Sequence, residues 1–192
     1  MRGFNHRKAV QALNIFAQKE GGSINKMKAI KLIWLSDRLH LRKYGRTITG
    51  DTYFALKLGP VPSNTRDILE ISPFSSEEEL SYSDDFISIT DKYNYKAKIV
   101  ANTKVFSQSD KDAFEEIYKV YGHLNHFELS ELSHLFPEWK RWETALQKSP
   151  PTRFLMDFND FFHNTEKENE VFNEEEEDLA LTKILYQRTE NQ

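Results

Sequence analysis

Residues 24–63 decide the fold of this chain, and they read INKMKAIKLIWLSDRLHLRKYGRTITGDTYFALKLGPVPS. Asn25 predicts a helix N-cap, because its side-chain oxygen can accept a backbone N–H of the first turn. The helix is predicted to run to Tyr44, where Gly45 supplies a left-handed stop. Two apolar stripes and a narrow polar edge indicate a central helix packed on two sides. The stripes are Met27, Ile30, Trp34, Leu41 and Tyr44, and Leu32, Leu35 and Leu39; the edge is Lys28, Lys31, Arg38 and Arg42.

An ITGD turn follows at residues 48–51, and a Gly59-Pro60-Val61-Pro62 corner comes next. Between them, residues 52–58 alternate in a way that fits a short strand, but one or two helical turns fit as well, and we favour helix. The prolines exclude a regular helix before them and favour a new start after them. Residues 63–71 are therefore predicted to be helical.

The rest of the chain predicts short helices and one β-hairpin. Residues 5–19 carry one apolar stripe and predict a first helix, whereas residues 72–85 predict a loop or a short helical turn. The hairpin is expected from residues 86–90 and 97–105, because both are rich in β-branched side chains. Ser109 and Asp112 predict a capping box for a later helix, and Asp157 a cap for the last short helix before residue 163.

These elements predict a mainly α-helical α+β fold: a compact helical domain over residues 1–165 with a small β-hairpin. A length of 192 residues suits one domain with a real core. Residues 166–192 are expected to form an acidic C-terminal extension. Its low-complexity part, residues 165–178, is expected not to pack, because it is acidic and poor in apolar side chains.

Charge is distributed unevenly along the chain. Residues 1–46 hold eleven Lys and Arg against two acids, so this segment carries +9 and leaves −13 for the remainder of a chain whose total is −4. Residues 165–192 carry −6. The two ends either lie on different faces or neutralise each other in the fold. Alternatively, the basic end offers a face to an acidic partner, or the acidic tail covers it.

Composition and motifs exclude several classes of function. The chain has no Cys and thus neither a disulfide framework nor a thiolate metal site, and it shows no signal peptide and no membrane-spanning apolar run. We expect a cytoplasmic protein. The nucleotide-binding and serine-hydrolase motifs GxxxxGK[ST], GxGxxG and GxSxG are absent. Nucleic acid is not an expected partner, since a basic segment alone is unspecific.

Asp37 is the residue most at odds with its surroundings, because it lies on an apolar stripe of the central helix. A buried carboxylate must be paired or hydrogen-bonded. It could serve as a general acid or base, but we favour a structural role in which it accepts N–H groups of the ITGD or GPVP turns. His123, His126 and His134 do not reproduce a metal-ligand spacing, and we expect His134 to be a half-buried structural side chain near Trp139.

Two blocks of sequence resemble the Panacea, or SocA-like, antitoxin domain over roughly residues 5–163. The first block is Lys28, Lys31, Leu32, Ile33, Trp34, Leu35, Ser36, Asp37, His40, Leu41, Gly45, Arg46, Ile48, Thr49, Gly50 and Asp51, followed by Gly59, Pro60, Val61, Pro62 and Ser63. The second block is Leu129, Ser130, Glu131, Leu132, Ser133 and His134 with Phe136, Pro137, Glu138, Trp139 and Lys140.

The resemblance implies an antitoxin of a type II toxin–antitoxin pair, from a bacterium, prophage or other mobile element, that neutralises a cognate protein toxin by direct binding. It implies no enzyme, no cofactor and no metal. It leaves open a host protease as a further partner, because one member of the family acts as a proteolytic adaptor. The oligomeric state is left undetermined. We expect the signature residues to hold the scaffold: Asp37, Thr49, Gly50, Asp51, Gly59, Pro60, His134 and Trp139.

The C-terminal extension recovers an apolar face over residues 179–186, which could dock on the domain itself or enter a groove of a partner. The candidate contact residues are Leu179, Leu181, Ile184, Leu185 and Tyr186. Two alternatives remain at this point. One is an interaction factor or proteolytic adaptor of a phage or mobile element that has no toxin partner. The other is a hydrolase or metal protein that uses Asp37 and His134.

Overall fold

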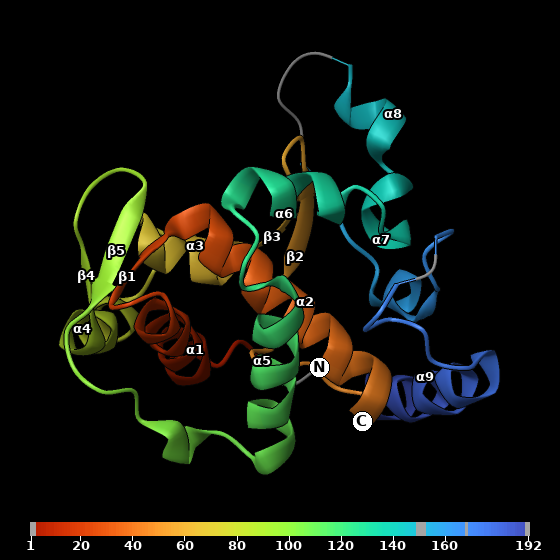
Figure 1. The fold of residues 1–192 in the computed structure, drawn as a ribbon, viewed down its shortest axis with the longest axis horizontal. Coiled ribbons are helices and arrows are strands. Elements are labelled where there is room, and N and C mark those ends of the chain that lie inside the picture. The colour runs from red at the N-terminus through yellow and green to blue at the C-terminus, as the bar shows by residue number, and fades with distance from the viewer. Residues whose placement is uncertain (1–2, 149–152, 168, 191–192) are drawn as a thin grey trace.

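The computed structural model describes residues 3–148, 153–167 and 169–190, and it has the predicted mainly helical α+β fold (Figure 1). The α-helices are α1 (His6–Lys19), α2 (Lys26–Tyr44), α3 (Ser63–Leu69), α4 (Glu77–Phe86), α5 (Gln108–Tyr121), α6 (His126–Ser133), α7 (Pro137–Lys140), α8 (Glu143–Leu146) and α9 (Glu176–Glu190). The 3₁₀ turns are η1 (Thr103–Val105) and η2 (Phe158–Phe162). The strands are β1 (Ser23–Asn25), β2 (Tyr53–Leu56), β3 (Gly59–Pro62), β4 (Ile87–Ile89), β5 (Asn94–Ala97) and β6 (Phe154–Leu155).

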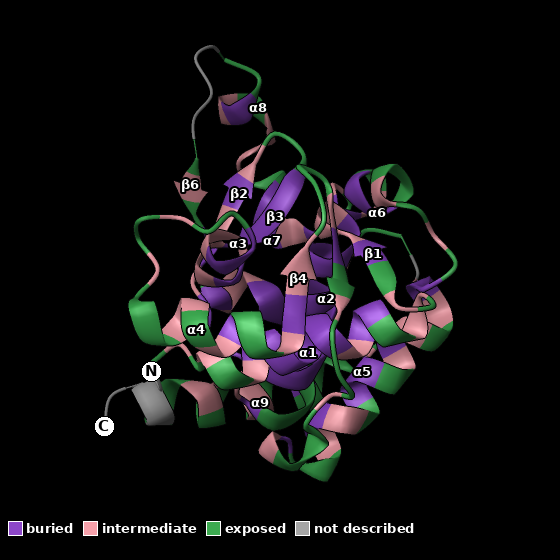
Figure 2. Cartoon of the chain, turned by 90° about the vertical axis from the view of Figure 1, so that its left-hand side faces the viewer, coloured by how far each residue is buried: buried purple, intermediate pink, exposed green. Residues whose placement is uncertain are grey.

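Helix α2 is the centre of the core, as predicted. Asn25 accepts the N–H groups of Met27 at 2.9 Å and Lys28 at 3.3 Å, and Gly45 ends the helix with φ +67°. Helices α1, α5, α6 and α9 all pack against it. Figure 2 shows α2 and the inward face of α1 in the purple of buried residues, in the middle of the molecule. Every α2 residue from 28 to 42 is buried.

The predicted polar edge of α2 is buried as well, which corrects that prediction. Its four bases are Lys28, Lys31, Arg38 and Arg42. Burial is tolerated because each charged head finds a partner from another element. Arg38 pairs with Glu138 at 2.8 Å, and Arg42 pairs with Glu174 at 2.7 Å. Sequence alone does not reveal these partners, because they lie about a hundred residues away.

Residues 53–56 form strand β2 and residues 57–58 a turn, rather than the helix we favoured for residues 52–58. Strand β2 pairs antiparallel with β3, in a register that places Tyr53 opposite Pro62 and Leu56 opposite Gly59. The other edge of β2 pairs with β6. The strand is favoured because β3 and β6 hydrogen-bond to its two edges. A single helical turn could not pair with either of them. Strand β3 lies at the sheet edge, where prolines cost no ladder hydrogen bond.

The predicted β-hairpin exists, but its second strand starts earlier than expected. Strand β5 begins at Asn94, inside the expected turn, and residues 98–105 lie outside the sheet. Asp91 tightens the turn by accepting the N–H groups of Tyr93 at 2.7 Å and Asn94 at 2.9 Å. Tyr95 fixes the register, because its buried hydroxyl donates to the Leu13 carbonyl at 2.9 Å. Strand β1 pairs with the other edge of β5 and completes a second three-stranded antiparallel sheet.

Two further predictions need correction at helix starts. Residues 72–85, where we expected a loop or a short helical turn, instead hold most of the ten-residue helix α4, which Ser76 and Glu79 begin with a reciprocal capping box. Helix α5 starts with Ser107 and Asp110 as its capping box, two residues before the predicted pair. Ser109 hydrogen-bonds His40 instead, at 3.0 Å. Asp157 does cap the last short helix, as predicted, by accepting the Asn159 N–H at 2.9 Å.

Part of residues 165–178 packs on the domain, contrary to prediction, whereas docking of the helix that follows was one of two alternatives left open. Val171 and Phe172 are buried, and Phe172 meets the Phe136 ring edge-on at a centroid distance of 5.3 Å. Helix α9 lies beside the C-terminal end of α2 (Figure 1). An acidic segment can pack here because Phe172 lies under the Arg38 guanidinium and Glu174 pairs with Arg42, both buried arginines of α2. Contact between the basic and acidic ends favours the interpretation that they neutralise each other. A domain boundary at residue 165 stays a prediction.

No helix in the part of the chain that the structure describes combines the length and apolar character needed to cross a membrane.

Candidate functional site

The Asp37 carboxylate is enclosed by donors from the segment that follows α2. Its Oδ1 accepts the N–H groups of Ile48 at 2.7 Å and Thr49 at 3.1 Å. Its Oδ2 accepts the hydroxyl of Tyr53 at 2.7 Å and that of Thr49. Burial raises the pKa of Asp37, and these hydrogen bonds oppose the rise. The backbone donors belong to the ITGD turn, as the sequence predicted. A carboxylate with all four contacts inside the fold is suited to holding this turn on α2.

Asp51 fastens the start of α3 in the same manner. Its Oδ1 accepts the N–H of Thr52 at 2.7 Å and that of Asn64 at 2.9 Å, and its Oδ2 accepts the N–H and hydroxyl of Thr65 at 2.8 and 2.6 Å. Pro62, at the N-cap position of α3, provides no side-chain cap. Asp51 therefore supplies the cap from the preceding turn. Burial raises its pKa, and the hydrogen bonds from Thr65 and Asn64 oppose the rise.

The second sequence block holds the β2–β3 hairpin through carbonyl groups. The Trp139 indole N–H donates to the Leu56 carbonyl at 2.7 Å, and the Ser130 hydroxyl donates to the Leu58 carbonyl at 2.9 Å. Helix α6 and Trp139 thus bond to the strand end and turn that precede Gly59. The two blocks, far apart in sequence, form one connected structure.

Gly59 lies at the closest approach between these blocks. Its φ of +98° disfavours other residues, and a Cβ at this position would collide with the side chains of Ser133 and Lys31. The Lys31 ammonium donates to the Pro60 carbonyl at 2.8 Å. Burial lowers the pKa of Lys31 well below its ordinary value of 10.5. Glycine is thus required here both by backbone conformation and by space.

His134 is half-buried and stacks on Trp139, with ring centroids 3.8 Å apart and an interplanar angle of 17°. Burial lowers its pKa, and the nearby charge of Lys31 lowers it further, so the imidazole is favoured in its neutral form. Its Nε2 atom has no hydrogen-bond partner within the described part of the chain. Among the described residues, no group of three or more His, Asp and Glu is arranged to hold a metal ion.

Arg38 and Arg42 are side chains of α2 whose contacts inside the fold sequence reasoning missed. The Arg38 guanidinium lies over the rings of Phe136 at 4.7 Å and Phe172 at 4.6 Å. Arg42 donates to the carbonyls of Phe161 at 2.9 Å and His163 at 3.0 Å as well as to Glu174. Burial lowers the pKa of Arg42 to about 10, and Glu174 opposes this shift. Their four-residue spacing on one face of α2 was the available signal.

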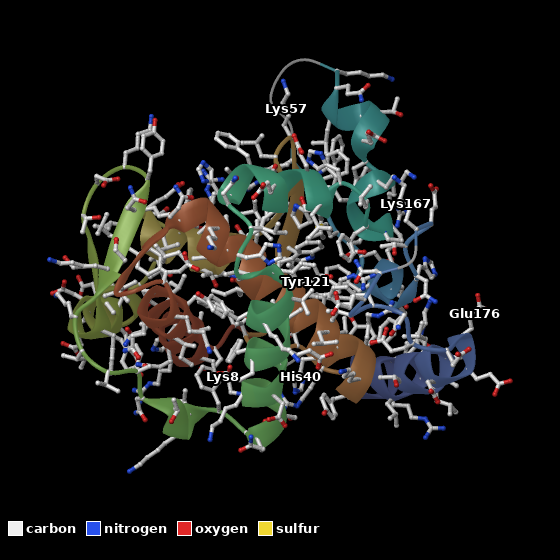
Figure 3. All side chains as sticks on the ribbon, viewed as in Figure 1. Lys8, His40, Lys57, Tyr121, Lys167 and Glu176 are labelled. Carbon is white, nitrogen blue, oxygen red and sulfur yellow. The ribbon has the colours of Figure 1, made fainter. Side chains whose placement is uncertain are left out.

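A third buried carboxylate, Asp110, connects the N-terminal end, α2 and α5. It accepts Lys8 at 2.5 Å and Arg46 at 3.0 Å, and the His40 Nε2 lies 3.2 Å from it. Figure 3 labels Lys8 and His40 in this region, far from Lys57 at the turn of the β2–β3 hairpin. Asp110 also caps α5, so this cluster is another structural junction.

The five candidate contact residues of α9 lie on different faces. Leu179 is 4% exposed, and Tyr186 packs against the rings of Phe158 and Phe162 at 6.1 and 5.8 Å. Leu181, Ile184 and Leu185 are exposed. A contact made through Leu179 would require the helix to move, whereas a contact through the exposed face stays a prediction.

A groove of about 730 Å³ opens at the N-terminal end of α2, whereas α9 packs near its C-terminal end. It lies between the N-terminal end of α2, the β2–β3 turn, α3, the β4–β5 turn, and helices α6 and α8. In Figure 1 the β4–β5 hairpin is at the left and α8 at the upper right, with α3, α6 and the β2–β3 hairpin between them. Of the eight signature residues none lines it, so sequence reasoning did not find it. Its lining comes from at least six separated segments, each too short to reveal a surface.

Comparison with known proteins identifies one family. A family model described as "Antitoxin SocA-like, Panacea domain" matches residues 30–140, which is more than half of the chain. The match contains Asp37, the ITGD turn, the GPVP corner and Trp139. No curated protein matches the chain. No solved structure matches it.

Proposed function

Since the chain belongs to the SocA-like Panacea-domain antitoxin family, we propose that it is the antitoxin of a type II toxin–antitoxin pair and neutralises a cognate protein toxin by direct binding. The match over residues 30–140 carries the proposal, because it spans both sequence blocks apart from Lys28. Proteins of this family generally act without catalysis. We further propose that the chain works in the cytoplasm, where its toxin is made.

The chemistry of the signature residues supports a binding protein rather than an enzyme. Asp37 and Asp51 direct both carboxylate oxygens at backbone and hydroxyl donors of the fold. A general base needs a position within hydrogen-bond reach of a substrate, and these buried acids are 0% exposed. We propose that Asp37, Thr49, Gly50, Asp51, Gly59, Pro60, His134 and Trp139 serve the scaffold.

Co-expression with the reading frame next to this gene tests the proposal. The adjacent protein is induced alone and together with the full chain, and colony formation and co-purification are measured. We expect the adjacent protein alone to arrest growth, and the chain to restore growth and co-purify with it. Growth arrest that the chain does not relieve would refute the proposal. Rescue accompanied by faster loss of the toxin would instead indicate a proteolytic adaptor.

A further inference from the structure

The groove described above has an apolar floor. Met27 and Ile30 of α2, Leu56 and Val61 of the β2–β3 hairpin, and Leu69 of α3 line it. Large apolar side chains also stand exposed at its edge. Leu58, Tyr93 and Phe127 are 51%, 61% and 62% exposed. A set of exposed apolar side chains around a concave floor is typical of a binding groove.

The edge of this groove is strongly basic, although the chain as a whole is acidic. Among the described residues, its lining includes six Lys and Arg and one acid, but Lys31 is buried and donates to the Pro60 carbonyl, so the edge carries +4 within a chain whose total is −4. The single acid, Glu70, is already paired with Arg66 at 2.9 Å. Four lysines make no ion pair within the described part of the chain: Lys26, Lys57, Lys92 and Lys148. Uncompensated charge of one sign around a groove attracts a partner of the opposite sign.

The floor of the groove distinguishes between two acidic partners. A single-stranded nucleic acid would stack its bases on aromatic platforms along a basic channel. Here the floor is aliphatic, formed by Met27, Ile30, Val61 and Leu69, and the aromatic side chains stand at the edge. Aliphatic floors bury aliphatic or aromatic anchors of a polypeptide, while the surrounding lysines meet carboxylates.

We propose that this groove binds an acidic, amphipathic segment of the partner protein, with apolar anchors on the floor and Asp or Glu opposite the four lysines. The inference rests on the proposed function only in naming the partner as a toxin. The chemistry of the segment follows from the groove itself. Electrostatic attraction to the basic edge also predicts that binding weakens as ionic strength rises.

Selection of random peptides displayed on phage tests the inference without knowledge of the toxin. The full chain is the bait, and the enriched peptides are synthesised and their binding measured. We expect enriched peptides to combine net negative charge with apolar residues. Lys57→Glu with Lys92→Glu should weaken their binding about tenfold, because each reversal replaces an attraction by a repulsion. Both lysines are exposed, so this variant should fold.

A matched control reverses two exposed lysines outside the groove, Lys104→Glu with Lys119→Glu, and should change binding less than twofold. Phe127→Ala should weaken binding through the apolar edge. Three outcomes overturn the inference: no enrichment of acidic peptides, equal binding by the two charge-reversed variants, or displacement of bound peptide by a labelled dT20 oligonucleotide that binds more tightly.

The same variants separate this inference from the proposed function. If wild type and the Lys57→Glu/Lys92→Glu variant neutralise the toxin equally and bind no acidic peptide, the groove inference fails and the antitoxin function stands. If the chain binds acidic peptides in the groove but rescues no toxin-arrested cells, the antitoxin function fails and the groove inference stands.

Discussion

Replacing Asp37 by Asn and by Leu distinguishes a structural carboxylate from a catalytic one. Asn has nearly the same shape and keeps one carbonyl oxygen for the N–H groups of Ile48 and Thr49. Its amide group then faces the hydroxyls of Thr49 and Tyr53, which can rotate to accept hydrogen bonds. Leu fills similar space but offers no acceptor at all.

The expected losses of stability differ severalfold. In Asp37→Leu, two buried backbone N–H groups lose their acceptor at about 1–3 kcal/mol each, which gives a loss of about 2–6 kcal/mol. This is a large part of the roughly 5–15 kcal/mol that stabilises a typical domain. Asp37→Asn should lie within about 1 kcal/mol of wild type at pH 7, because the loss of charged hydrogen bonds is offset by removal of a buried charge.

The sign of the pH dependence follows from the raised pKa. Because burial raises the pKa of Asp37 above its ordinary value of 3.8, the folded state holds this proton more tightly than the unfolded state. The stabilising contribution is present below the unfolded pKa and is lost as pH rises through the folded pKa. Asn does not titrate. The difference in unfolding free energy between wild type and Asp37→Asn should therefore shift in favour of Asn as pH rises.

Urea denaturation of both variants and wild type, between pH 3.5 and 8, measures these differences, and toxin neutralisation is assayed in parallel. The other carboxyl groups titrate in all three proteins and cancel in the comparison. Asp37→Asn that is as destabilised as Asp37→Leu would refute the argument from desolvation. Asp37→Leu within about 1 kcal/mol of wild type would refute the argument from hydrogen bonds. A stable Asp37→Asn that has lost all function would favour catalysis.

Three further predictions concern other junctions of the fold. Gly59→Ala should lower the unfolding free energy by about 2–4 kcal/mol in thermal or urea melts, since it combines backbone strain with overpacking; a loss below about 0.5 kcal/mol would contradict this. Glu174→Gln should destabilise the chain by about 1–2 kcal/mol and speed hydrogen exchange of α9 amides, because buried Arg42 loses its charged partner; unchanged exchange would argue against this link. Leu181→Asp with Ile184→Asp should preserve the melting temperature, because both side chains are exposed, and should weaken toxin neutralisation; full neutralisation would remove this face of α9 from the interface.

Sequence reasoning was reliable where structure is decided locally. The Asn25 cap and the Gly45 stop of α2 depend on side chains within a few residues, and both were predicted correctly. Strand β2, within residues 52–58, was not predicted correctly. The alternation of its side chains also fits a helix, and the residues that stabilise the strand are distant in sequence. Trp139 bonds β2 from 83 residues away, and β6 pairs with its other edge.

The predictions for the polar edge of α2 and for residues 165–178 were wrong for the same reason. Lys and Arg are usually exposed, and an acidic segment poor in apolar residues usually does not pack. Arg38 is an exception to the first expectation and Phe172 to the second. Each depends on the other, because the Arg38 guanidinium lies over the Phe172 ring and both side chains are buried. Neither residue indicates, from its own stretch of sequence, that the other lies beside it. An interaction that needs two exceptions at once cannot be inferred from either stretch of sequence.

The candidate groove shows why segment charge is a poor guide to surface charge. The net charge of +9 on residues 1–46 suggested a basic face in the N-terminal quarter. Much of that charge is instead neutralised in buried ion pairs such as Arg42 with Glu174. The groove draws Lys57, Lys92 and Lys148 from other parts of the chain. A folded surface collects charge across elements, so its net charge follows from topology rather than from runs in the sequence.

Separation of the signature residues from the groove lining has a consequence for partner choice. Residues that hold the scaffold, such as Asp37 and Asp51, are buried and direct their polar atoms at the fold. The exposed groove residues, such as Lys57, Lys92 and Phe127, lie at turns and helix ends, where substitution costs little stability. If the proposed groove selects the partner, we expect a change of partner to need changes only at the groove edge, while the buried carboxylates keep the same framework beneath it.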